Sequence, residues 1–130
     1  MRVTVLLENT TCRDDVVCRH GLSLFIETTH HRILFDAGPS DDFAAHAAVL
    51  GIDLSGADIA VLSHGHWDHG NGMPLFLTLN SAAPLYVRPG ADGDYYAAEG
   101  DGYRYIGIPK SLADRSGRII ATAPRYEIDS

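Results

Sequence analysis

The chain has 130 residues, of which 45% are hydrophobic and 21% are charged, and this length fits one domain (1–130) that can bury a core. Its formal net charge is −7 and its ten Lys and Arg form no run, so nucleic acid and anionic membrane surfaces are not expected partners. No apolar stretch approaches the roughly 20 residues that cross a bilayer, and no signal-peptide pattern follows Met1, so we expect a cytoplasmic protein.

The first part of the chain predicts strands followed by a helix. Runs of β-branched and large apolar side chains, bounded by turn residues, predict three strands at residues 2–7, 22–28 and 33–35. Ser40 is then a favourable N-cap, and the acidic residues that follow it suit the positive end of a helix dipole. Gly51 ends this predicted helix.

The rest of the chain continues with strands and helices. Residues 58–63 are apolar on both faces, as in a central strand covered on both sides, and residues 73–80 predict a second helix. The Gly- and Asp-rich stretch 90–102 predicts a loop with a short helix around 95–99. Further strands are predicted at 84–87, 103–108 and 118–122. This order predicts an α+β fold, with a mixed sheet and helices on one of its faces.

Three of the seven histidines lie in SHGHWDHGNG (63–72), directly after the predicted central strand. His64 and His66 are two residues apart in extended backbone, so their side chains leave the same face and can bind one ion. Asp68 and His69 follow after a turn, which suits a second ion. Accidental histidines in a polar turn do not account for four ligand-type residues in six positions. The segment therefore predicts a metal centre.

The types of these side chains indicate which metal and which chemistry to expect. Imidazole with carboxylate favours zinc, iron or manganese over calcium or magnesium. A water between two such ions loses a proton near neutral pH, and the resulting hydroxide is a nucleophile. Asp68 can orient that hydroxide or take up its proton, which makes it the candidate catalytic residue.

Two segments carry a resemblance to a known family. Residues 64–69 (HGHWDH) resemble the H-x-H-x-D-H signature of the metallo-β-lactamase superfamily, and Asp36-Ala37-Gly38 resembles its D-x-G segment. Together with residues 63–72, residues 8–10 (ENT) and 20–23 (HGLS) are similar to the subfamily of dihydropterin-type phosphate synthases. The resemblance extends from the N-terminus to about residue 108.

The resemblance implies an αβ/βα sandwich that binds one or two metal ions, most commonly zinc, at the edges of its sheets. In that pattern His64 and His66 serve the first ion, and Asp68 and His69 serve the second. Asp36 corresponds to an aspartate that supports the ligands from behind. His20, before the second strand, is expected to line the mouth of the site or to be a structural turn residue.

This chain departs from the family pattern in its later part. The family completes its sites with later histidines and with an aspartate or cysteine, whereas this chain has no histidine after His69. We therefore expect the N-terminal half of the sandwich, with one apolar sheet face uncovered. Such a face predicts association, either as a homo-oligomer or with a separately supplied second half.

Three hypotheses of function follow. The first is a metal-dependent hydrolase-like enzyme that acts on an ester, amide or phosphate bond of a small molecule and is completed by another chain; an iron-dependent redox reaction is a variant of it. The second is a truncated, catalytically inactive metal-binding or assembly module. The third is a fragment of a longer protein. His46, in an Ala-rich helix, is expected at the helix surface or an interface.

Overall fold

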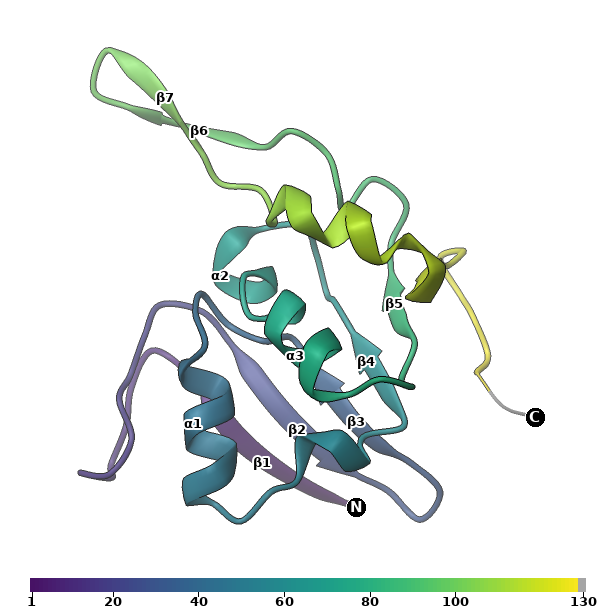
Figure 1. Ribbon diagram of the computed structural model, residues 1–130. Coiled ribbons are helices and arrows are strands. Elements are labelled where there is room, and N and C mark those ends of the chain that lie inside the picture. Colours follow the sequence, from purple (N-terminus) through teal and green to yellow (C-terminus); the bar gives the residue numbers. More distant parts are fainter. Residues whose placement is uncertain (129–130) are drawn as a thin grey trace.

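Figure 1 shows the computed structural model of the chain, which describes residues 1–128 apart from the side chains of Ala113 and Ser116. A sheet of six strands forms the body, and a separate two-stranded hairpin projects from it. The strands of the sheet are β1 (Arg2–Leu7), β2 (Ser23–Glu27), β3 (Arg32–Phe35), β4 (Ile59–Val61), β5 (Leu85–Val87) and β8 (Ile119–Ala121). The hairpin consists of β6 (Tyr96–Glu99) and β7 (Gly102–Tyr105). The helices are α1 (Asp42–Val49), α2 (Trp67–Gly70) and α3 (Met73–Leu79), with 3₁₀ segments η1 (Leu54–Gly56) and η2 (Lys110–Arg118).

The sheet is mixed, with the strand order β1-β2-β3-β4-β5-β8. The first three strands pair antiparallel, and β3, β4, β5 and β8 run parallel to one another. Parallel neighbours need crossover connections, and α1 and α3 supply two of them on the same face of the sheet (Figure 1). The predicted mixed sheet with helices on one face is therefore confirmed. Within residues 1–128, no helix is long and apolar enough to cross a bilayer.

The core lies between the sheet and these helices. One row of register partners crosses four strands, and each of its side chains is at most 2% exposed: Phe25, Leu34, Ala60 and Leu85. Phe76 of α3 belongs to the same cluster and is fully buried. Burying such side chains contributes roughly 1.5–3 kcal/mol each to stability, so this layer fixes the strand ends that carry the site.

The opposite face of the sheet, which we call the open face, is also apolar. Because side chains alternate along a strand, the neighbours of the core row point to this face. Two rows of register partners cross it: Val3, Ile26, Ile33 and Ile59, and Val5, Leu24, Phe35, Val61, Tyr86 and Ile120. We expected residues 58–63 to be covered on both sides, and Ile59, which belongs to a row of the open face, is only 3% exposed. The exposed part of this face lies at the sheet edge, where Val3 and Val5 are about half exposed. The uncovered apolar face agrees with the expectation from the sequence.

The segment 90–102 differs from its prediction. A short helix was expected around residues 95–99, but this stretch contains β6, which pairs antiparallel with β7. The rings of Tyr96 and Tyr105 lie directly opposite in this register, with centroids 5.4 Å apart. Gly100 adopts a φ of 59° at the turn, a conformation that glycine favours. A cross-strand aromatic pair therefore outweighs the weak helical pattern.

The prediction for His46 was wrong, because its side chain is only 4% exposed. Nε2 accepts a hydrogen bond from the Val17 N–H at 3.1 Å, so the ring proton is on Nδ1 and is donated to the Leu6 carbonyl at 2.7 Å. His46 thus ties helix α1 to β1 and to the loop that leads to His20.

Candidate metal centre

The site begins where the parallel strands β3 and β4 end. The carboxyl ends of adjacent parallel strands share one edge of the sheet, so Asp36 and Ser63 lie side by side. The Asp36 N–H donates to the Val61 carbonyl at 2.9 Å, which continues the pairing of the strands by one residue. Asp36 has a φ of 56°, uncommon for a residue other than glycine, and its side chain is fully buried.

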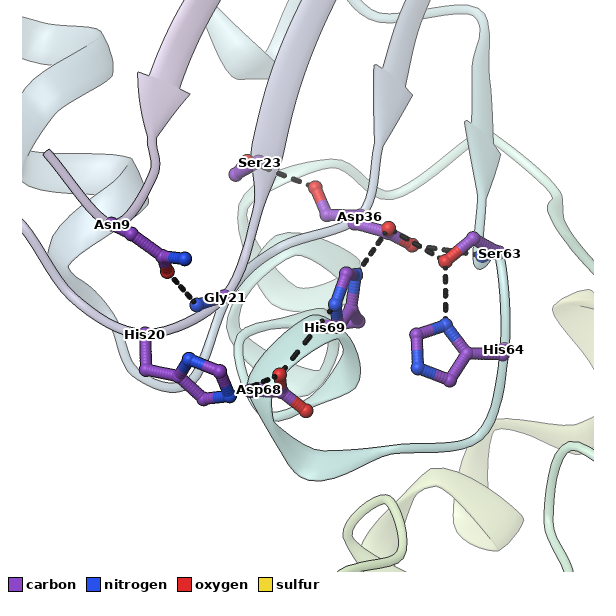
Figure 2. A network of polar contacts seen from close by, with 9 residues as sticks. All are labelled: Asn9, His20, Gly21, Ser23, Asp36, Ser63, His64, Asp68 and His69. Carbon is purple, nitrogen blue, oxygen red and sulfur yellow. Dashed lines mark hydrogen bonds and ion pairs between the residues drawn. The ribbon is translucent and has the colours of Figure 1, made fainter.

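The buried carboxylate of Asp36 is fully engaged in hydrogen bonds (Figure 2). Oδ1 accepts the Ser63 N–H at 2.8 Å, and Oδ2 accepts the Ser63 hydroxyl at 2.7 Å. Oδ2 also lies 2.7 Å from Nδ1 of His69, which donates its proton because the carboxylate can only accept. His69 therefore presents the lone pair of Nε2 to the site.

Ser63 extends this hydrogen-bond network to His64 and fixes the tautomer of its ring as well. Its hydroxyl has one proton, which the Asp36 carboxylate accepts, so the Ser63 oxygen accepts a proton from His64 Nδ1 at 2.9 Å. His64 then also presents Nε2 as a ligand atom. Burial, followed by repulsion from His69 and His66, lowers the pKa of His64. The ring is thereby kept in the neutral form that a metal requires.

Three ligand atoms converge in front of this support. His64, Asp68 and His69 each offer one atom, and these atoms all lie within 4.8 Å of one another. Oδ2 of Asp68 is 3.6 Å from Nε2 of His69. Two imidazoles with one carboxylate suit zinc and iron(II), and three protein ligands are typical of catalytic zinc sites. Within residues 1–128 this group contains no residue after His69.

His66 lies beside this group. Its ring stands edge-on to that of His64, with centroids 4.6 Å apart, and edge-on to Tyr95 at 5.6 Å. The structure therefore groups His64 with Asp68 and His69, whereas the sequence led us to pair it with His66. Gly65 faces the Ala91 carbonyl so closely that an added Cβ would overlap the oxygen. This contact fixes the backbone between the two histidines.

His20 lies at the rim of the site (Figure 2). Its side chain is 74% exposed, and Nε2 is 3.2 Å from Oδ2 of Asp68. The next residue, Gly21, has a φ of 134°, and a Cβ there would overlap the Asp68 carbonyl. The Gly21 N–H donates to the side chain of Asn9 at 3.0 Å, so the loop is held against the metal segment. His20 thus lies beside the candidate ligand Asp68, and its role at the site mouth stays a prediction.

Sequence reasoning missed two side chains that shape the site. Ser63 directly precedes the first histidine of the motif, and a hydroxyl at that position was a usable signal that we did not interpret. Tyr95 contacts the ring of His66 from the start of the hairpin, in a segment we predicted as loop and helix. No local pattern indicates that contact, because it depends on how the hairpin lies against the metal segment.

Comparisons with known proteins show what this chain is similar to. Residues 16–129 match the family described as the Metallo-beta-lactamase superfamily. The uncharacterized protein MJ0448 of Methanocaldococcus jannaschii is 31% identical over 112 residues, which cover 86% of this chain and 42% of that protein. The 7,8-dihydropterin-6-methyl-4-(beta-D-ribofuranosyl)-aminobenzene-5'-phosphate synthase of the same organism is 31% identical over 77 residues, which cover 55% and 26%.

A solved structure shows the same fold. The chain aligns to MEM-A1, a subclass B3 metallo-beta-lactamase from a soil metagenome library, with a TM-score of 0.56 and 20% identity. The alignment covers 82% of this chain and 41% of MEM-A1. The matched region is thus less than half the length of each of these proteins.

Proposed function

The chain belongs to the metallo-β-lactamase superfamily, and on that basis we propose that it is a metal-dependent hydrolase-like protein that acts on a small molecule. The convergence of His64, Asp68 and His69 carries this proposal. Both imidazoles turn Nε2 toward the carboxylate because their Nδ1 atoms are engaged by Ser63 and Asp36. A merely polar turn needs no such orientation.

These residues fit a zinc ion, with iron or manganese as alternatives. His64, Asp68 and His69 would hold it, and His66 is available as a ligand to the same ion or to a second one. When bound, zinc would lower the pKa of water and polarise an ester, amide or phosphate oxygen. The same set of two histidines and one carboxylate also suits iron(II) in redox enzymes, which supports the variant reaction as a second candidate.

The protein's own groups provide a route for a proton. Asp68 faces the group with a side chain that is only 13% exposed, whereas His20 is 74% exposed. Their 3.2 Å contact places an exposed imidazole beside this carboxylate, so His20 could take up a proton released at the site and pass it to water. Asp36 takes no proton in this scheme, because its role is to hold His69 and Ser63.

The open face supports a proposal about assembly. Nine of the ten side chains in its two rows are apolar, and the tenth is Tyr86; a sheet face of this kind that no helix covers is typical of an interface. We propose that a second copy of the chain packs its own open face against it, as in a two-sheet sandwich. The edge with Asp36 and Ser63 borders this face, so a second copy could bring further ligands to the site. In a catalytically inactive protein, the same contact would serve assembly alone.

Two measurements test these proposals. Zinc-loaded and EDTA-treated protein are compared on p-nitrophenyl phosphate, bis-p-nitrophenyl phosphate, p-nitrophenyl acetate and a β-lactam; we expect hydrolysis of at least one that requires zinc and is lost in His69→Ala. Equal rates in all three preparations would contradict the enzymatic proposal.

Light scattering tests the proposed assembly and should give the mass of a dimer. Val5→Glu, a change at a half-exposed position of the open face, should give a monomer. A monomeric wild type would contradict the proposed assembly.

A further inference from the structure

We infer that the hollow between Trp67 and the β6–β7 hairpin binds an aromatic ring that carries an anionic group, which defines the substrate class of the neighbouring metal centre. The hollow has a volume of about 520 Å³, within the range of pockets that hold small ligands. Its lining includes Trp67, Arg104 and Tyr105. The inference rests on the proposed function, because it identifies the hollow with the substrate site of that enzyme.

The hairpin is fixed to the metal segment at its base. The Trp67 N–H donates to the Ile106 carbonyl at 2.9 Å, and His66 forms an isolated β-bridge with Gly107. Trp67 directly precedes the ligand Asp68, and its ring centroid lies 6.3 Å from that of His20 at the rim. The candidate ligands do not line the hollow, but a molecule bound there would contact Trp67, which joins the hollow to Asp68 along the chain and to His20 at the rim.

The walls of the hollow are aromatic and held in place. Tyr105 donates its hydroxyl proton to the Ile108 carbonyl at 3.0 Å, which fixes the ring from its far end. A Cβ at Gly107 would overlap this phenol, so glycine leaves the room that the ring occupies. Trp67 forms the other aromatic surface of the lining. Planar ligands gain from such surfaces because aromatic side chains offer large contact areas at low entropic cost.

The charged residue in the lining of the hollow is Arg104. The guanidinium of Arg104 lies 5.8 Å from the centre of the Trp67 ring, and Nζ of Lys110 lies 5.3 Å from the Tyr105 ring. The lining contains no carboxylate, since its other members are Pro39, Asn71, Gly107 and Pro109. Nζ of Lys110 is paired with Oδ1 of Asp94, so Arg104 supplies the cation of the hollow. A cation beside two rings selects for a ligand that is both aromatic and anionic.

Arg104 keeps the capacity to bind such an anion. Its contact with Glu99 involves Nε at 3.4 Å, and both side chains are at least half exposed. Exposed pairs of this kind are weak, and a guanidinium has five N–H donors, of which the fork of two terminal nitrogens matches phosphate or carboxylate.

Trp67 is the chain's single tryptophan, so its fluorescence reports directly on this hollow. The test titrates EDTA-treated protein with phenylphosphonate, with methylphosphonate (the anion without a ring) and with benzyl alcohol (the ring without charge). We expect saturable quenching by phenylphosphonate at a concentration about tenfold or more below that needed for either of the others. Absence of saturable binding, or equal affinity for all three, would overturn the inference.

A pair of variants tests the role of the cation. Arg104→Gln should weaken phenylphosphonate binding about tenfold and leave the affinity for benzyl alcohol unchanged. The control is Arg125→Gln, a change at an exposed arginine paired with Glu127, and its affinities should match those of the wild type. An unchanged phenylphosphonate affinity in Arg104→Gln would overturn the inference. Zinc titration of the same proteins separates the two claims: zinc binding without phenylphosphonate selectivity would overturn this inference alone, and the reverse result would overturn the metal centre alone.

Discussion

Oδ2 of Asp36 lies 2.7 Å from Nδ1 of His69, and the carboxylate that carries this oxygen is fully buried. The contact joins the end of β3 to α2, two segments separated by 33 positions. A buried carboxylate that accepts three hydrogen bonds is a rigid support, and it sets the orientation of one histidine directly and of a second through Ser63. The arrangement matches the carboxylate–histidine pairs that orient metal ligands in other proteins.

Asp36→Asn is the most direct test of this support. The amide has the same shape but one acceptor oxygen. It therefore cannot accept the Ser63 N–H on one side and the protons of Ser63 Oγ and His69 Nδ1 on the other, and the support of the two histidines is weakened. We expect zinc affinity to fall about 10- to 100-fold, measured by competition with a chromophoric chelator. Asp101→Asn, the same change at an exposed position, is the matched control. An unchanged zinc affinity in Asp36→Asn would show that the support is irrelevant to the metal.

Ser63→Ala should have a smaller effect of the same kind. The change removes the hydroxyl that links Asp36 to Nδ1 of His64, while the Asp36 contact with His69 remains. We expect zinc affinity to fall about tenfold and the free energy of unfolding to fall by about 1 kcal/mol. Calorimetric zinc titration and urea unfolding measure the two quantities, with Ser81→Ala, at an exposed turn residue, as control. A loss of zinc affinity as large as that in Asp36→Asn would contradict the view that Asp36 supports both histidines and Ser63 only one.

Gly65→Ala tests the packing of the metal segment. A methyl group at this position would overlap the Ala91 carbonyl, so the backbone between His64 and His66 must shift. We expect a loss of about 1–3 kcal/mol in the free energy of unfolding, measured in urea, together with weaker zinc binding. The control is Gly117→Ala, where a Cβ meets nothing within 4 Å and the expected change is within about 0.5 kcal/mol. Equal stability of the two variants would contradict the close packing.

His46→Leu tests the structural role of the buried histidine. The change leaves the Leu6 carbonyl and the Val17 N–H without their partner. An unsatisfied buried polar group costs about 1–3 kcal/mol, so the melting temperature should fall, and the loop that leads to His20 should become more sensitive to proteolysis. His30→Leu, at an exposed turn residue, should leave both unchanged. If the two variants behave alike, His46 does not hold the loop.

Much of the sheet was predictable because its signals are local. The strands at 2–7, 22–28, 33–35, 84–87 and 118–122 and the two main helices carry apolar patterns bounded by turn residues, and the structure confirms these elements. The strand predicted at 103–108 overlaps β7, but β6 was missed. Its pairing with β7, such as that of Tyr96 with Tyr105, joins two strands and gives no pattern within residues 96–99. His46 was misjudged because alanines surround it and give no indication of which helix face is buried.

The site was only partly predictable for a similar reason. The dense motif identified His64, His66, Asp68 and His69 as candidate ligands, but the spacing of two residues suggested that the first two form a pair. In the structure, Asp36 and Ser63 hold Nδ1 of His69 and of His64, and these two histidines form one group with Asp68, with His66 beside it. Hydrogen-bond direction depends on contacts between distant segments, so spacing alone could not give it. Metal binding by these residues stays a prediction.

The zinc content per chain tests the central claim most directly. Protein purified without chelators is passed over a sizing column, and zinc and protein are measured in the same fractions for wild type, His69→Ala and His30→Ala. The account predicts about one zinc ion per chain, or two if His66 helps to hold a second, in wild type and in His30→Ala, and none in His69→Ala. A zinc-free wild type that takes up no added zinc, or a His69→Ala variant that retains the full amount, would contradict it.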